Sequence, residues 1–337
     1  MTQAPTQIDA RDLRDPEVFF RDVVAPCQPV VLSGFVDHWP AVAAGRTSPE
    51  ALCDLIRPFD AGGQTEIFSG KPDIAGKYYY ADDLKGFNFQ RRPTSVPAAL
   101  DAILAGLDHP DGETLYMGSL PADAYLPGFS KQNPLGVLGP DISPRLWMGH
   151  PSNVSAHYDA MENIACVVAG KRRFTLYPPD AIADLYVGPI HHTMAGQPVS
   201  LAASLPPDPE RFPRFEQAKA RRLVCDLLPG DALFLPKLWW HQVESTAPFN
   251  CLVNYWWDAF KSGPDAPYTT MLLAMIAIAE RPAPERQAWR AFFEHYVFRP
   301  NGHPLAHLPP ETHGPLGALK DNYGMIRARV MQILRGG

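Results

Sequence analysis

The pattern of apolar and polar positions changes along the chain. A strand is expected at residue 115, and the strand signals are clearest from residue 221 to residue 257. Short runs there are rich in apolar, β-branched and aromatic residues, and a Pro-Gly-Asp turn separates two of them, which is typical of strands joined by turns. Pro229-Gly230-Asp231 predicts a tight turn that makes the runs on either side of it paired strands. The clearest runs are 221–228, 232–236, 239–245 and 250–257.

Helical patterns precede this region. Residues 16–24 are expected to form a helix, with Asp15 as its cap and Pro16 at its first position. Two further helices are expected over 48–56 and 96–107.

Helical patterns also follow the strand-rich region. In the middle one of three expected helices, apolar residues recur at three- and four-residue spacing. The expected helices cover 268–280, 285–297 and 319–334. We therefore predict a mainly β fold with helical additions, in which residues 1–258 form the β domain and residues 259–337 a C-terminal helical segment. A chain of 337 residues fits one such core better than two equal domains.

Composition narrows the range of functions. The formal net charge is −6 and no long basic tract occurs, so nucleic acid is not expected as a partner. No signal peptide is apparent, and the apolar stretch 266–279 is too short to span a membrane. The five cysteines contain no Cys-x-x-Cys pair, so we expect buried free thiols in the reducing cytoplasm.

Three residues carry the candidate chemistry: His157, Asp159 and His241. Alternate residues of a strand point to the same side, so His157 and Asp159 can converge on one ion while Tyr158 faces away. His241 must then arrive from a distant strand. Two histidines and one carboxylate on one face of an octahedral Fe(II) leave the opposite positions open for other ligands.

Several motifs in order give the chain a family resemblance: 153–159, Asn163, 170–179, 229–231 and 235–245. It resembles the cupin-like JmjC oxygenases, most of all the asparaginyl hydroxylase that inhibits hypoxia-inducible factor and its bacterial relatives. The resemblance implies a double-stranded β-helix of the jelly-roll type, Fe(II), and 2-oxoglutarate and O₂ as co-substrates.

The resemblance also implies roles for individual residues. His157, Asp159 and His241 would be the iron ligands. Tyr116 would meet the distal carboxylate of 2-oxoglutarate. The other candidates for the co-substrate pocket are Ser155, Asn163, Arg172, Asn254 and Trp256. Ser155 stands two residues before His157, where the relatives have a Thr or Ser three residues before.

Arg172 is a departure from the asparaginyl hydroxylase, which has a lysine two positions after the glycine. A guanidinium can grip a carboxylate through two hydrogen bonds, so Arg172 suits the role if the pocket accepts its larger head. Lys171 is the alternative, because neighbours on a strand point to opposite faces and only one can enter. A basic turn between strands, including Arg173, is the remaining interpretation.

The predicted function is an Fe(II)- and 2-oxoglutarate-dependent dioxygenase that hydroxylates a C–H bond and releases succinate and CO₂. The substrate is expected to be a protein or peptide side chain, with a small molecule as the other possibility; hydroxylation and demethylation both stay open. One alternative is a Zn or Mn cupin isomerase or hydrolase, although such sites usually show a His-x-His pair. The other is a non-catalytic binding or regulatory protein.

Two surface regions are expected to serve partners. The insertion 177–221, with His191 and His192 as structural or rim residues, and the Tyr78-Tyr79-Tyr80 run are candidates for a substrate-facing rim. The C-terminal helices of relatives often dimerise, so a homodimer is predicted; the alternative is that these helices pack on the β core. Four tryptophans are expected to supply apolar bulk around the pocket, although plain core packing is expected for at least two of them: Trp239, Trp240, Trp256 and Trp257.

Overall fold

A computed structural model describes residues 3–81, 84–190, 193, 196–261, 263 and 265–336. The chain divides into two compact units, Met1–Ala259 and Phe260–Gly337, which are described separately. The first is mainly β with helical additions, and the second is helical.

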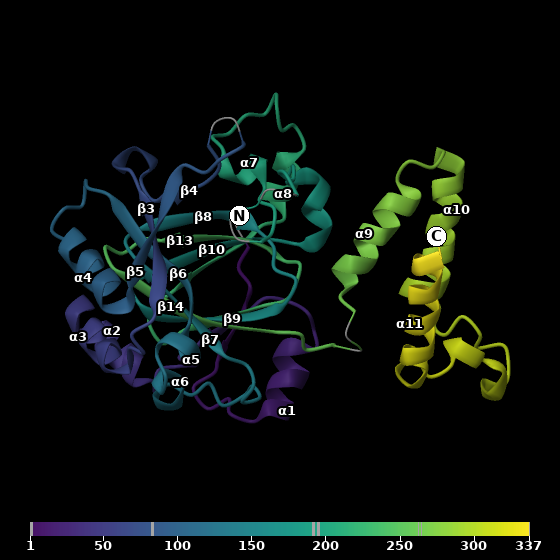
Figure 1. Ribbon diagram of the computed structural model, residues 1–337, viewed down its shortest axis with the longest axis horizontal. Coiled ribbons are helices and arrows are strands. Elements are labelled where there is room, and N and C mark those ends of the chain that lie inside the picture. Colours follow the sequence, from purple (N-terminus) through teal and green to yellow (C-terminus); the bar gives the residue numbers. More distant parts are fainter. Residues whose placement is uncertain are drawn as a thin grey trace. The chain divides into compact units, whose positions relative to one another are not determined.

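Two sheets form the first unit (Figure 1). The larger has nine strands in the order β1-β2-β12-β9-β14-β7-β6-β3-β5, and the smaller has five in the order β11-β10-β13-β8-β4. The strands of the larger sheet are β1 (Thr6–Asp9), β2 (Val30–Ser33), β3 (Gln64–Gly70), β5 (Phe89–Ser95), β6 (Thr114–Pro121), β7 (Pro144–Gly149), β9 (Glu162–Ala169), β12 (Ala232–Leu235) and β14 (Asn250–Trp257). Those of the smaller sheet are β4 (Lys77–Tyr78), β8 (Ser152–His157), β10 (Arg172–Tyr177), β11 (Leu223–Leu227) and β13 (Trp240–Ser245).

The eight strands from β7 to β14 form the expected double-stranded β-helix. The chain passes back and forth between the sheets, with β7, β9, β12 and β14 in one and β8, β10, β11 and β13 in the other. Apolar side chains of both sheets share one core between them, among them Val167 and Leu233 from the larger sheet and Phe174 and Leu227 from the smaller. This arrangement gives the sheets a common interior in which a site can form.

The predicted pairing across Pro229-Gly230-Asp231 is wrong. β11 pairs with β10 in the smaller sheet, whereas β12 pairs with β2 and β9 in the larger. Gly230, at φ 101°, turns the chain from one sheet to the other, and its N–H donates to the Val167 carbonyl at 2.9 Å. A tight turn sets the direction of the chain but not the partner of the next strand, which here is set by burial.

Helices cover the outer face of the larger sheet (Figure 1). Leu52, Ile56 and Ile103 of these helices pack in one core with Met148 and Val168 of the sheet. The three predicted N-terminal helices are confirmed, with the first ending in a π-helical turn, whereas α2 was not predicted. The elements are α1 (Pro16–Phe19), η1 (Phe20–Val24), α2 (Pro40–Thr47), α3 (Pro49–Ile56), η2 (Arg57–Phe59), η3 (Pro72–Ile74), α4 (Val96–Gly106), α5 (Ala122–Tyr125) and α6 (Phe129–Gln132).

The insertion between β10 and β11 contains η4 (Pro179–Asp184), α7 (Leu201–Ser204) and α8 (Phe215–Ala220). Part of it runs beside the first metal-site strand, because Val199 forms a bridge with His157 and the Ser200 N–H donates to the Ala156 carbonyl at 2.7 Å. His191 and His192 lie outside the described residues.

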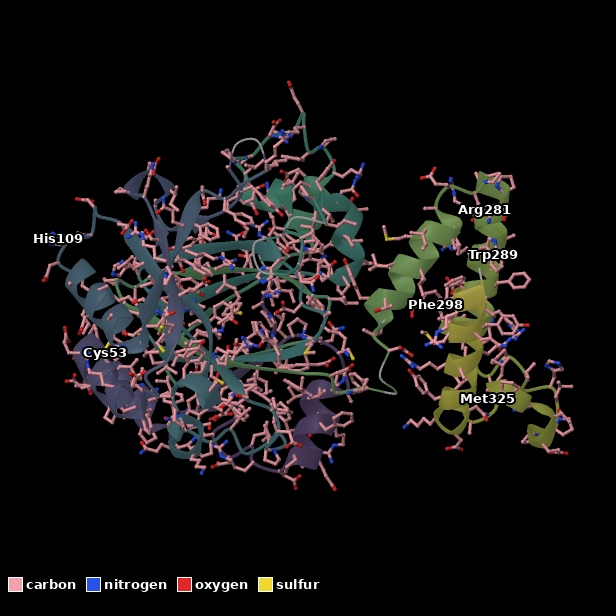
Figure 2. The ribbon with its side chains drawn as sticks, viewed as in Figure 1. Cys53, His109, Arg281, Trp289, Phe298 and Met325 are labelled. Atoms are coloured by element: carbon pink, nitrogen blue, oxygen red, sulfur yellow. The ribbon has the colours of Figure 1, made fainter. Side chains whose placement is uncertain are left out.

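The second unit contains α9 (Pro267–Ile278), α10 (Ala283–Phe293), η5 (Glu294–Phe298), η6 (Pro310–Thr312), η7 (Gly314–Leu316) and α11 (Leu319–Gly336). The three C-terminal helices are therefore confirmed. None of their described side chains is buried, and large apolar residues such as Trp289, Phe298 and Met325 are exposed (Figure 2). Among the described residues, no helix is both long and apolar enough to span a bilayer.

Candidate metal centre

His157, Asp159 and His241 meet in the interior of the first unit. One possible ligand atom from each lies within 4.8 Å of the others. His157 ends β8 and pairs directly with His241 of β13, which brings their rings to 4.3 Å between centroids. Asp159 lies just beyond the end of β8, and its Oδ2 is 3.7 Å from His241 Nε2.

Both histidine rings are oriented by main-chain carbonyls. His157 Nδ1 lies 2.8 Å from the Ser155 oxygen, and His241 Nδ1 lies 3.0 Å from the Trp239 oxygen. A neutral ring that donates from Nδ1 keeps the lone pair on Nε2, the form that binds a metal. Burial, and secondarily the neighbouring His157, lowers the pKa of His241 to about 4, so this ring is neutral at physiological pH.

A cavity of about 120 Å³ adjoins the three side chains and lies between the two sheets. It is lined by all nine residues that the sequence nominated, and their roles stay predictions. Trp256 Nε1 donates to Asp159 Oδ2 at 3.1 Å, which fixes one carboxylate oxygen. The remaining lining is mostly apolar and includes Phe68, Tyr78, Phe89, Trp147, Phe174, Val199, Val243 and Leu252.

Arg172 faces this cavity from β10. Only 1% of the residue is exposed, and its buried Nε and Nη2 have no hydrogen-bond partner among the residues that the structure describes. Tyr116 lies beside it: burial raises the pKa of this hydroxyl, and the charge and hydrogen bond of Arg172 oppose the rise. Lys171 points elsewhere and pairs with Asp226 at 3.2 Å on the surface. A buried guanidinium with unsatisfied donors suits an anionic ligand, above all a carboxylate.

Trp147 is a pocket residue that the sequence analysis missed. Its indole N–H can only donate, and it does so to Asn254 Oδ1 at 2.6 Å. Asn254 Nδ2 must then donate to Asn163 Oδ1, at 3.0 Å. The tryptophan therefore sets the direction of both amides, and the Nδ2 of Asn163 is left as a donor. A signal existed in the alternation of Arg145 and Trp147 with the buried Leu146 and Met148.

Of the four tryptophans expected to surround the pocket, only Trp256 lines it. The other three pack in apolar cores, which agrees with the expectation of core packing for at least two of the four. Trp239 joins the core between the sheets, Trp240 packs against Tyr158 at 4.9 Å between centroids, and Trp257 packs against the core on the outer face. Adjacent strand residues point to opposite sides, so a Trp-Trp pair supplies at most one side chain to an interior wall.

The two expected rim regions form one structure. Tyr79 and Tyr80 share an apolar cluster with Val199 of the insertion. Val199 and Gln197 line the cavity, and so does Tyr78. The insertion and the tyrosine run thus both contribute to the wall of the site.

The donor set fits a divalent metal. Two imidazole nitrogens and one carboxylate oxygen converge from one side, which is the ligand set of non-haem Fe(II) oxygenases. The cavity beside them leaves room for further ligands, and Arg172 and Tyr116 also line it. The described residues therefore suit both an Fe(II) ion and a small dicarboxylate.

Known proteins resemble the chain over most of its length. Residues 16–263 match the family described as a cupin-like domain. The human bifunctional peptidase and (3S)-lysyl hydroxylase JMJD7 is 29% identical over 274 residues, which are 71% of this chain and 80% of that protein. The Drosophila melanogaster Jumonji C domain-containing protein 5 is 36% identical over 270 residues, 75% of this chain and 59% of that protein.

The Arabidopsis thaliana lysine-specific demethylase JMJ31 is 34% identical over 114 residues, which are 34% of this chain and 20% of that protein. The chain thus spans most of the human relative but a smaller part of the other two. The family match covers well over half of the chain, and it agrees with the jelly-roll core and the His157, Asp159 and His241 group. The chain belongs to the cupin-like, JmjC-type oxygenase family.

Proposed function

We propose that the protein is an Fe(II)- and 2-oxoglutarate-dependent hydroxylase. The observation that carries this proposal is the pairing of a two-histidine, one-carboxylate group with a buried, unsatisfied arginine in one cavity. A metal site alone would suit many cupins, whereas a dicarboxylate co-substrate needs a cation at a fixed distance from the metal. Arg172 is that cation.

Some side chains bind the metal and the co-substrate, and others exclude water. His157, Asp159 and His241 would hold the iron, and Trp256 keeps the Asp159 carboxylate in place. Arg172 and the hydroxyl of Tyr116 bind the distal carboxylate. The raised pKa of Tyr116 keeps its proton on the hydroxyl oxygen, so that the tyrosine donates to the carboxylate. Ser155, Asn163 and Asn254 add polar groups, and the aromatic lining excludes water.

The bound iron supplies the oxidising chemistry, in which O₂ and 2-oxoglutarate convert a C–H bond to C–OH with release of CO₂ and succinate. One oxygen atom enters the new hydroxyl group and the other enters succinate, so the atoms balance. The protein's part is to hold the target carbon beside the metal while water is kept out.

The proposed prime substrate is a protein or peptide side chain. One relative is named as a (3S)-lysyl hydroxylase and another as a lysine-specific demethylase, and both names refer to lysine residues. The rim formed by the insertion and the tyrosine run is the part of this chain that would contact such a substrate. The free cysteines agree with a reducing compartment such as the cytoplasm.

Succinate formation tests the proposal. Wild-type protein, loaded with Fe(II) without oxygen, is mixed with 2-oxoglutarate and O₂, and 2-oxoglutarate binding is measured separately by calorimetry with Mn(II) in the metal site. We expect succinate from the wild type and none from His157→Ala. Arg172→Gln should weaken 2-oxoglutarate binding roughly 10- to 100-fold, because a charge-assisted hydrogen bond contributes about 1.5–3 kcal/mol.

Arg173→Gln is the matched control, because Arg173 lies on the same strand but pairs with Asp226 on the surface. It should bind 2-oxoglutarate as the wild type does. Metal binding without any 2-oxoglutarate binding by the wild type would reject the proposal and favour a Zn or Mn cupin or a binding protein.

The second unit is proposed as a homodimer interface. Its helices leave many large apolar side chains exposed, and apolar surface of this extent usually marks a protein contact. A second copy of the chain is the partner that we propose for it.

A further inference from the structure

The loop that leads into the strand of His241 has an unusual backbone. It crosses from β12 in the larger sheet to β13 in the smaller one. Leu238 in this loop adopts φ 68°, a left-handed conformation that is unfavourable for a leucine. Its N–H donates to the carbonyl of Asp159 at 2.8 Å, so the loop before one metal-site residue is bonded to the backbone of another.

Lys237 anchors this loop between two carboxylates. Its Nζ lies 2.6 Å from Asp258 Oδ1 and 3.4 Å from Glu162 Oε2. The Glu162 side chain is only 2% exposed and also accepts the Ala259 N–H at 2.9 Å. An ammonium ion between two carboxylates is therefore held in a largely buried setting, where ion pairs are screened less than at the surface.

Each partner of Lys237 belongs to a segment that carries a metal-site residue. Glu162 follows Asp159 by three residues, and Asp258 follows Trp256, the indole donor to Asp159, by two. Lys237 itself precedes His241 by four residues. The three segments converge on one ammonium group, although no member of the cluster lines the cavity.

We propose that Lys237 is a positioning residue of the metal centre, which sets the distance between Asp159 and His241 by tying their segments to the end of β14. The inference rests on the proposed metal-dependent function. Without the ammonium, the buried Glu162 carboxylate loses the cation that pairs with it among the described residues, and it repels Asp258. The loop then loses the anchor beside strained Leu238, and the two ligands lose their fixed spacing. Groups that orient metal ligands in this way typically contribute 10- to 100-fold to metal affinity.

Titration of the full-length apoprotein with Co(II) tests the inference. The visible absorption of Co(II) reports ligand geometry and the isotherm gives the dissociation constant, while the thermal midpoint of each apoprotein reports stability alone. Lys237→Met should weaken Co(II) binding roughly 10- to 100-fold and change the spectrum. Lys237→Arg keeps the charge and should restore most of the affinity and the wild-type spectrum.

Lys219→Met is the matched control. Lys219 pairs with Glu216 at 2.6 Å and is about as exposed as Lys237, at 33% against 25%, but both members of this pair lie on α8, which carries no metal-site residue. Its affinity and spectrum should equal those of the wild type. If Lys237→Met does not fold, Asp258→Asn provides the milder change and should weaken Co(II) binding several-fold.

One result would overturn the inference: the variant that folds, Lys237→Met or Asp258→Asn, has a lower thermal midpoint but the Co(II) affinity and spectrum of the wild type. The cluster would then have a purely structural role. That result differs from failure of the proposed function, in which the wild type itself would not bind 2-oxoglutarate, whether or not it binds metal.

Discussion

A single donor decides how the polar side of the cavity is arranged. The amide groups of Asn254 and Asn163 could each point either way, and only the indole of Trp147 fixes them, because it has a hydrogen to give and no lone pair to accept. The order of the chain Trp147, Asn254, Asn163 is thus a property of one residue type at one position.

Trp147→Phe should lower the free energy of unfolding by about 1–3 kcal/mol, because the Asn254 oxygen then lacks its donor in a buried place. Denaturant unfolding of the full chain measures the effect. Trp289→Phe is the control, since Trp289 is exposed and bonded only weakly, at 3.4 Å, to Glu285. Equal effects of the two substitutions would contradict this assignment.

The thiols are expected to differ sharply in reactivity. Cys27 is exposed, which corrects the expectation that all five are buried, whereas burial raises the pKa of Cys53 (Figure 2) and Cys225 to about 12. A thiol with that pKa is only about one part in ten thousand thiolate at pH 8. We expect one fast thiol in a disulfide-exchange assay of the native protein, and Cys27→Ser should abolish it. A second fast thiol would contradict the burial.

The sequence revealed the residues whose type and spacing carry chemistry. His157 and Asp159 are two positions apart, and Arg172 stands within a motif, so local pattern was enough to nominate them. Trp147 escaped because its function depends on Asn254, which is 107 positions away. Lys237 escaped for a similar reason: its partners Glu162 and Asp258 are defined only when three separate segments of the chain come together.

Among the elements, α4 and the strands β6 and β7 are joined by one histidine. His150 follows β7; its Nε2 lies 2.8 Å from the Ile103 carbonyl of α4, and its Nδ1 accepts the Leu115 N–H of β6 at 3.1 Å. The ring therefore donates from Nε2 and accepts at Nδ1. Gly106, near the end of α4, leaves the space that the ring fills, since a Cβ there would collide with it.

Gly106→Ala should destabilise the protein by about 1–3 kcal/mol through overpacking, although alanine favours helices by about 1 kcal/mol. In a His150→Ala background the clash is gone, and the same substitution should be neutral or stabilising. A double-mutant cycle of unfolding free energies measures this coupling. Additive effects would show that the helix can shift away from the ring.

The elements themselves were easier to predict than their partners. Helices with marked caps, such as those after Asp15, Ser48 and Ser95, appear where local signals place them. The pairing of β11 with β10 was missed because the long insertion separates those strands in the sequence. The turn between β11 and β12 instead suggested that these two strands pair. Local chemistry specifies where a strand begins, whereas burial in the whole sheet selects its neighbour.

At the scale of the whole molecule, the exposed apolar surface of the second unit leads to a prediction about assembly. Ile276 is 82% exposed, and other large apolar side chains of the same helices are also open to solvent. Light scattering after size exclusion should give a homodimer at micromolar concentration. Ile276→Glu should shift it toward monomer, because a buried unpaired carboxylate opposes association.

Ile182→Glu is the control for that experiment, since Ile182 is also exposed but lies in the first unit. It should leave the dimer intact. A wild-type monomer would favour the alternative, in which the helical faces pack on the β core.

The buried charge of Arg172 also has a consequence for product binding in the proposed reaction. An arginine does not give up its proton, so an empty cavity obliges the fold to keep a solitary positive charge away from water. Any dicarboxylate of suitable length would pair with this buried charge, and the succinate formed in each turnover is such a dicarboxylate. We therefore expect succinate, the product of the proposed reaction, to stay bound in the pocket and to raise the melting temperature. The proposed enzyme should then respond to the ratio of succinate to 2-oxoglutarate in its surroundings.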